Sequence, residues 1–157
     1  MRPHPRATLR QKPSDMPNNR LNVLVHLVWS TWKRDPQIVE AWEPDLHRYI
    51  EAVCRNVGYQ PAAVGGTADH VHLLVSLSNT VTLATLMQAV KGGASHFVND
   101  SCPVDCAFRW QGGYGAFGVS PRDRARVIAY IRNQKAHHAN GTLWPHAEMV
   151  CDERCGA

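Results

Sequence analysis

Apolar and polar positions alternate along the chain in two patterns, one typical of strands and one typical of helices. Dense runs of Val, Leu and other apolar residues predict strands over residues 22–30 and 70–77, and a further strand is expected over residues 59–65. Apolar residues at helical spacing predict amphipathic helices over residues 44–57 and 83–98. The predicted order of elements in the first half of the chain is therefore strand, helix, strand, strand, helix.

The second half adds short strands and a last helix. Strand segments are expected over residues 108–110 and 116–119, on both sides of a glycine-rich turn. A helix is expected over residues 121–138, because Ser120 can cap free amides and Pro121 presets the first turn. The whole order predicts an α+β protein of the ferredoxin-like split βαβ type. Its antiparallel sheet would carry helices on one face, leave the other open, and be followed by the C-terminal helix.

Composition limits the class of protein. The chain has 157 residues, enough for one domain. A composition of 44% hydrophobic and 19% charged residues is typical of a soluble globular protein. No stretch approaches the roughly 20 apolar residues of a membrane span. A net charge of +4 suits an anionic partner such as a nucleic acid.

The two ends differ from the middle. Residues 1–20 are basic and proline-containing without the apolar core of a signal peptide, so we expect a disordered leader and a cytoplasmic protein. Five cysteines, an odd number, argue against a secreted disulfide framework. A zinc site is the alternative, but the spacing is wider than is usual for structural zinc, so we expect reduced thiols. The cysteines that would form it are Cys102, Cys106, Cys151 and Cys155.

Candidate chemistry begins with His70 and His72. Side chains alternate along a strand, so both imidazoles project to the same face and can bind one divalent cation. A pKa of about 6.5 leaves both rings mostly neutral at neutral pH, as metal binding requires. The alternative is two histidines on a polar sheet face. Further along, Tyr130 and Gln134 lie four residues apart, on one face of the last predicted helix. From the helix alone, a half-buried core tyrosine and a solvated glutamine are the favoured interpretation.

Several blocks of sequence occur in an order that resembles one known family. They are VHLVWST at 25–31, GTADHVHLLV at 66–75, VKG at 90–92, WQGGYGAFGVS at 110–120, YIRNQ at 130–134 and the histidine pair at 137–138. Together they resemble the HUH single-tyrosine transposases of insertion sequences, including the repeat-associated tyrosine transposases. The resemblance covers about residues 21–138, and the tryptophan- and glycine-rich block before the tyrosine helix is its most specific part.

The resemblance implies an enzyme, a metal-dependent tyrosine transposase that cleaves and rejoins DNA. It implies that His70, His72 and Gln134 hold Mg²⁺ or Mn²⁺ and that Tyr130 forms a 5′-phosphotyrosine link. Because that link keeps the energy of the broken phosphodiester, strand transfer would need no ATP. The implied partner is single-stranded DNA with hairpin ends, and family members are homodimers of the bacterial cytoplasm, associated with the nucleoid.

Basic residues on and near the last two predicted helices are candidate DNA contacts. Neutralising phosphates gives affinity that depends on salt and not on base sequence. The alternative for each is a solvated helix face. The candidates are Lys91, Arg122, Arg124 and Arg132.

Two other functions stay open. One is a non-catalytic or domesticated nucleic-acid-binding protein of the same fold, and the other is a metal-dependent hydrolase that activates a water at the histidine pair. The transposase domain is expected over residues 21–140, followed by a tail over 141–157 that differs from the family's usual C-terminal helix. Gly118 also stands where the family commonly has serine.

Overall fold

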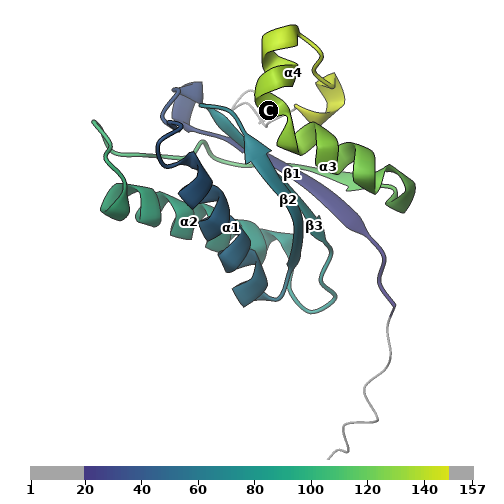
Figure 1. Ribbon diagram of the computed structural model, residues 1–157. Helices are drawn as coiled ribbons and strands as arrows, with labels where there is room; N and C mark the ends of the chain where they lie inside the picture. The colour runs from purple at the N-terminus through teal and green to yellow at the C-terminus, as the bar shows by residue number, and fades with distance from the viewer. Residues whose placement is uncertain (1–19, 149–157) are drawn as a thin grey trace, which may run out of the picture.

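An antiparallel sheet forms the centre of the molecule in the computed structural model, which describes residues 20–148 (Figure 1). Its strands are β1 (Leu24–Ser30), β2 (Gln60–Gly66), β3 (His70–Ser76) and β4 (Gly115–Val119), in the order β2-β3-β1-β4. The helices are α1 (Glu43–Val57), α2 (Leu83–Ser101), α3 (Arg124–Arg132) and α4 (Gln134–Asn140), with 3-10 turns η2 (Trp32–Arg34), η3 (Pro121–Asp123) and η4 (Pro145–Ala147). This order confirms the predicted α+β split βαβ arrangement.

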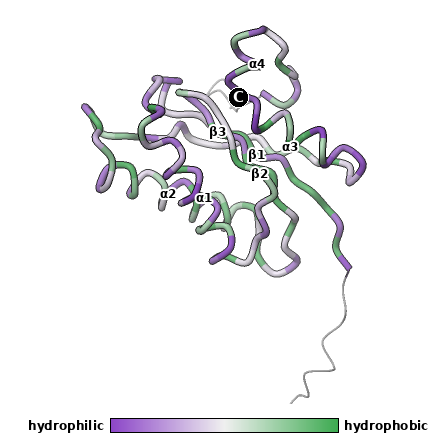
Figure 2. Tube along the Cα trace, viewed as in Figure 1, coloured by the Kyte–Doolittle hydropathy of each residue, from purple (hydrophilic) through white to green (hydrophobic). Residues whose placement is uncertain are grey.

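One face of the sheet packs against α1 and α2. Leu27 and Trp29 of β1 lie opposite Leu73 and Val71 of β3, and all four side chains are fully buried. They belong to the main hydrophobic core together with apolar residues of both helices, such as Leu46. Figure 2 shows hydrophobic residues along much of β1, as expected of a central strand that is covered by helices.

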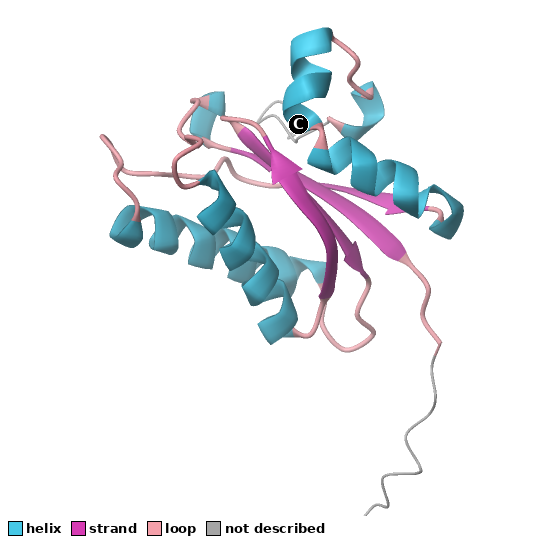
Figure 3. Ribbon diagram, viewed as in Figure 1, coloured by secondary structure: helices cyan, strands magenta, loops and turns pink. Residues whose placement is uncertain are grey.

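The opposite face carries α3, so it is not open as expected (Figure 3). Leu24 and Leu74 of the sheet pack there against Val127 and Ile131 of α3, which makes a second, smaller core. The apolar area that α3 buries on the sheet therefore stabilises its position there.

The expected single helix over residues 121–138 is wrong in detail, because the structure divides it. After η3 and α3 the backbone leaves helical geometry at Asn133, with φ −104° and ψ 23°, and α4 then begins. The Asn133 side-chain amide donates to the carbonyl of Ala129 at 2.9 Å. The backbone N–H of Asn133 donates to the same carbonyl at 3.1 Å, so this oxygen accepts two bonds from Asn133 where regular helix geometry ends.

The expected strand over residues 108–110 is reduced to one isolated bridge between Thr31 and Trp110. Lys91 fixes the loop that follows, because its Nζ donates to the carbonyls of Gln111 and Gly113 at 2.7 Å each. Within the expected strand, the N–H and the carbonyl of Phe108 bond to the side-chain amide of Asn99 at 2.8 and 3.0 Å, so they are not available to extend a sheet.

Some expectations concern residues beyond the described part. The expected leader lies outside residues 20–148, except for Arg20. Residues 149–157 of the expected tail also lie outside, and with them Cys151 and Cys155, two of the four cysteines of the alternative zinc site.

Within residues 20–148 no helix is both long and apolar enough to cross a bilayer.

The contact between β2 and α3 gives a test of this packing. A Cβ added at Gly65 would lie 2.1 Å from the backbone oxygen of Ile131. Gly65→Ala should therefore force strand and helix apart and lower the free energy of unfolding by about 1–3 kcal/mol in urea denaturation.

A matched glycine provides the control. Gly92 of α2 is exposed, and a Cβ there would meet nothing within 4 Å. Gly92→Ala should raise the free energy of unfolding by about 0.5–1 kcal/mol, because alanine is the better helix former. Equal effects of the two substitutions would contradict the close approach of β2 and α3.

Candidate metal and tyrosine site

His70 and His72 lie on β3 and point toward α3 and α4. They alternate with Val71 and Leu73, which face the main core, so the spacing argument for a shared face is confirmed. Both imidazoles are fully buried, at 0% exposed. The alternative of two histidines on a polar sheet face holds in that the face is polar, but the face is buried and not open to solvent.

The neighbour of His70 in the sequence fixes the orientation of its ring. Nδ1 of His70 lies 2.6 Å from Oδ1 of Asp69 and 2.9 Å from the hydroxyl of Thr67. Burial works against charge on Asp69, but hydrogen bonds from His70 and Thr67 hold the pKa of this carboxyl well below its usual range. Because a carboxylate only accepts, Nδ1 carries the proton and Nε2 keeps its lone pair for a ligand.

His72 pairs with a further histidine, His26 of β1. Nε2 of His26 lies 2.8 Å from Nδ1 of His72, and the two rings are stacked. Burial, with the nearby His72, lowers the pKa of His26 to about 3, and burial also lowers the pKa of His72. Both rings are therefore neutral at neutral pH. Nε2 of His72 is buried and has no hydrogen-bond partner among the described residues, as expected of an atom that binds something else.

Three more polar side chains converge on the Nε2 atoms of these histidines. Gln134 is 1% exposed, so it is not solvated, and its Oε1 lies 3.3 Å from Nε2 of His70. His138 brings its Nε2 to 3.2 Å from the same atom. Glu148, which follows η4, places Oε2 at 3.5 Å from Nε2 of His70 and Oε1 at 3.5 Å from Nε2 of His72.

This donor set fits a hard divalent cation. The ligand atoms of His70, His72 and Glu148 all lie within 4.8 Å of one another. Adjacent ligands in an octahedral shell of radius about 2.1 Å are about 3.0 Å apart, close to the 3.3–3.5 Å contacts seen here. Carboxylate and amide oxygens suit Mg²⁺ and Mn²⁺, whereas imidazole nitrogens suit first-row transition cations, so this mixed donor set fits Mn²⁺ better than Mg²⁺.

Tyr130 of α3 borders the same cluster. Its ring is 1% exposed and stacks on the indole of Trp144 with centroids 4.0 Å apart. Its hydroxyl donates to Oε1 of Glu148 and accepts the backbone N–H of Trp144 at 3.2 Å. Burial, together with the bond to Glu148, raises the pKa of Tyr130, so the phenol is protonated at neutral pH. The structure thus brings together all four residues of the expected site: Tyr130, His70, His72 and Gln134.

Sequence reasoning missed Glu148 and Trp144. They lie after the end of α4, in a segment without hydrophobic periodicity, so no spacing rule places them near β3. His26 and Asp69 were within the blocks that carry the family resemblance, but nothing in their spacing gives them a role. Asp69 could have been found by asking which group orients the adjacent His70.

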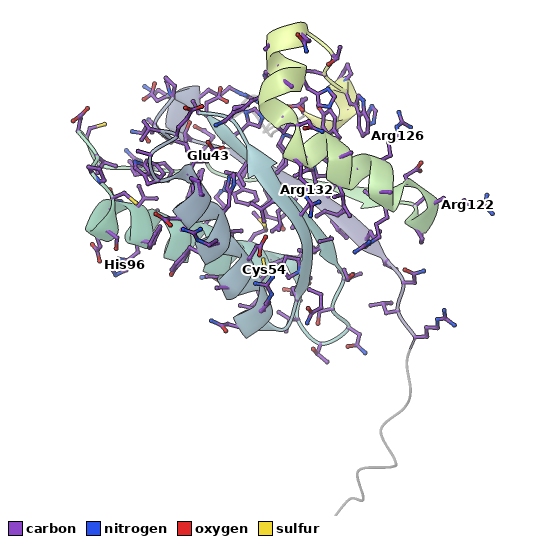
Figure 4. The ribbon with its side chains drawn as sticks, viewed as in Figure 1. Glu43, Cys54, His96, Arg122, Arg126 and Arg132 are labelled. Carbon is purple, nitrogen blue, oxygen red and sulfur yellow. The ribbon has the colours of Figure 1, made fainter. Side chains whose placement is uncertain are left out.

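The candidate DNA contacts divide into two groups. Arg122, Arg124 and Arg132 are exposed on η3 and α3. Figure 4 shows Arg122 and Arg132 together with Arg126, whose guanidinium lies 4.6 Å from the ring centre of Trp144. Lys91 is different, because its ammonium is occupied by the loop carbonyls described above.

The bond between Asp69 and His70 can be tested by the proton position it imposes. Asp69→Asn replaces a charged acceptor by an amide, so long-range ¹H–¹⁵N spectra should show less of the Nδ1–H tautomer at His70. Asp100→Asn is the control. Within residues 20–148, the ion pair of Asp100 is with His96, an exposed residue of α2. A His70 tautomer that is unchanged by Asp69→Asn would contradict the assignment.

Two solved structures resemble the chain in fold. One is the crystal structure of a candidate transposase from Deinococcus radiodurans R1, with 24% identity and a TM-score of 0.57 over 76% of this chain and 98% of that one. The other is a REP-associated tyrosine transposase bound to a REP hairpin, with 16% identity and a TM-score of 0.58 over 83% of this chain and 81% of that one. No curated protein is similar enough to count as a match.

The sequence itself matches a family model. Residues 19–134 match the model described as "Transposase IS200 like", and this span includes both histidines, Tyr130 and Gln134. The resemblance expected from the sequence blocks is therefore confirmed, and the chain belongs to the IS200-like transposase family.

Proposed function

We propose that the protein is a single-stranded DNA transposase that cleaves and rejoins DNA through a 5′-phosphotyrosine intermediate. Membership of the transposase family supports the general role. One observation carries the finer proposal: the Tyr130 hydroxyl and the Nε2 atoms of both histidines contact the same carboxylate, that of Glu148. The candidate nucleophile and the candidate metal ligands therefore border one small volume.

The chemistry follows from these positions. The Tyr130 oxygen attacks phosphorus, the bond from phosphorus to the 3′ oxygen of the leaving strand breaks, and that oxygen takes up a proton while the phenol loses one. A divalent cation, Mg²⁺ or Mn²⁺, held by His70, His72 and Gln134 would supply Lewis acidity to the phosphate. The reverse step, by another strand's 3′-OH, rejoins DNA.

The proposed substrate is single-stranded DNA with hairpin ends. The related REP-associated transposase was solved with a REP hairpin, which supports this class of substrate. Exposed Arg122, Arg124 and Arg132 provide positive charge along η3 and α3 for phosphates. Lys91, whose ammonium holds the loop at Gln111, would act by shaping that loop. A homodimer and a nucleoid location stay predictions from the family resemblance.

Metal dependence is the first test. EDTA should stop cleavage of a hairpin-flanked single strand, and Mg²⁺ or Mn²⁺ should restore it. His72→Asn should reduce cleavage to background, because it removes one of the two buried imidazoles proposed to hold the cation. His96→Asn, at an exposed position of α2, should cut normally. Normal cleavage by EDTA-treated protein would refute the metal assignment.

Tyr130→Phe tests the nucleophile. This change keeps the ring that stacks on Trp144 and removes only the hydroxyl, at a cost of about 1–3 kcal/mol for the lost hydrogen bonds. Cleavage should fall to background. Wild-type protein should form a denaturant-resistant adduct with labelled single-stranded DNA, and mass spectrometry should locate it on Tyr130.

Tyr59→Phe is the matched control, since Tyr59 is also buried and its hydroxyl donates to the carbonyl of Val81 far from the site. That variant should form the adduct normally. A non-catalytic DNA-binding protein would give no adduct with any variant, and a hydrolase would cut equally with Tyr130→Phe. Either result would reject the tyrosine mechanism.

A further inference from the structure

We propose that Glu148 is a ligand of the divalent cation and that the same carboxylate positions Tyr130. Glu148 lies beyond residues 19–134, the span that matches the family model, so the family match does not assign it this role. The inference deepens the proposed function and depends on it for the reaction.

The two oxygens of Glu148 have different neighbours. Oε1 accepts the hydroxyl of Tyr130 and lies 3.5 Å from Nε2 of His72. Oε2 lies 3.5 Å from Nε2 of His70 and 3.7 Å from Nε2 of His138. One oxygen is thus directed at the nucleophile and the other at the histidines. A single carboxylate links the two halves of the site.

Among residues 20–148, no lysine or arginine forms an ion pair with this carboxylate. Its side chain is only 15% exposed, and its ion-pair partners in this range are histidines. A buried charge is costly unless it is paired or binds a metal. A divalent cation between Glu148 and the imidazoles supplies a positive charge.

Packing holds Glu148 in this place. Gly141 has φ +65° and ends α4, so the chain turns back along α3. Trp144 then stacks on Tyr130, and Ala147, at 3% exposed, donates its N–H to the carbonyl of Trp144 at 2.8 Å. The segment from Trp144 to Glu148 is therefore anchored by contacts that do not involve the metal ligands.

A carboxylate also completes a suitable ligand set. Two imidazoles and the Gln134 amide are neutral donors, and hard cations such as Mg²⁺ and Mn²⁺ prefer charged oxygen ligands. Adding Glu148 gives four protein ligands.

Binding of Mn²⁺ to the full chain, followed by isothermal titration calorimetry and by the electron paramagnetic resonance signal of free Mn²⁺, tests the ligand role. Glu148→Gln has the same shape and can still accept the Tyr130 hydroxyl, but it lacks the charge. It should weaken Mn²⁺ binding by at least the roughly tenfold loss that even outer-shell partners of metal sites cause. Glu40→Gln is the control: Glu40 is 87% exposed and pairs with Lys135, so Mn²⁺ affinity should not change. Wild-type affinity in Glu148→Gln would overturn the proposal.

The positioning role has its own readout. At saturating Mn²⁺, Glu148→Ala should form the Tyr130 adduct more slowly than Glu148→Gln in single-turnover experiments, because only glutamine can accept the hydroxyl. Circular dichroism checks that both variants fold. Equal rates would overturn this role.

Failure here is distinguishable from failure of the proposed function. If Glu148→Gln binds Mn²⁺ as wild type does while wild-type protein still forms the Tyr130 adduct, only the role of Glu148 is rejected. If wild-type protein forms no adduct, the Mn²⁺ titrations still decide whether Glu148 is a ligand.

Discussion

The structure depends on one constraint, the burial of a polar cluster between the sheet and its C-terminal helices. Imidazoles, an amide and a carboxylate lie where most proteins place apolar side chains, and each polar atom there needs a partner. His26 and Asp69 satisfy the Nδ1 atoms of His72 and His70 from the sheet side. The Nε2 atoms that remain all point toward α3 and α4, so the sheet presents its lone pairs in one direction.

The two hydrophobic cores explain how the fold tolerates a buried polar cluster. The large core under α1 and α2 is on the other face of the sheet, and it fixes β1 and β3 through residues such as Trp29 and Leu73. The smaller core around Val127 and Ile131 attaches α3 right beside the cluster. Gly65 permits the close contact that this requires. The polar site is thus held by two apolar layers and does not have to stabilise the fold itself.

Those parts of the fold and site that follow from local sequence could be predicted. Alternation along β3 puts His70 and His72 on one face, and helical spacing makes Tyr130 and Gln134 neighbours. The order of strands and helices follows from hydrophobic runs in the same way. The break at Asn133 could not be predicted, because sequence spacing does not show that its side-chain amide and backbone N–H donate to the same carbonyl. Glu148 could not be placed either, since its approach to β3 depends on the turn at Gly141 and on the packing of Trp144.

The stack of Trp144 on Tyr130 has a kinetic consequence. A phenol that is 1% exposed cannot meet a phosphorus atom while the indole covers it. In the proposed reaction, the rate of strand cleavage would be the product of an opening equilibrium and the chemical step. An aromatic stack contributes about 0.5–1.5 kcal/mol beyond its buried area, and the hydrogen bond from the Trp144 amide adds about 1 kcal/mol. A difference of a few kcal/mol corresponds to an open population of roughly 0.1–10%. The stacked indole thereby sets how often the Tyr130 hydroxyl, the proposed nucleophile, is exposed.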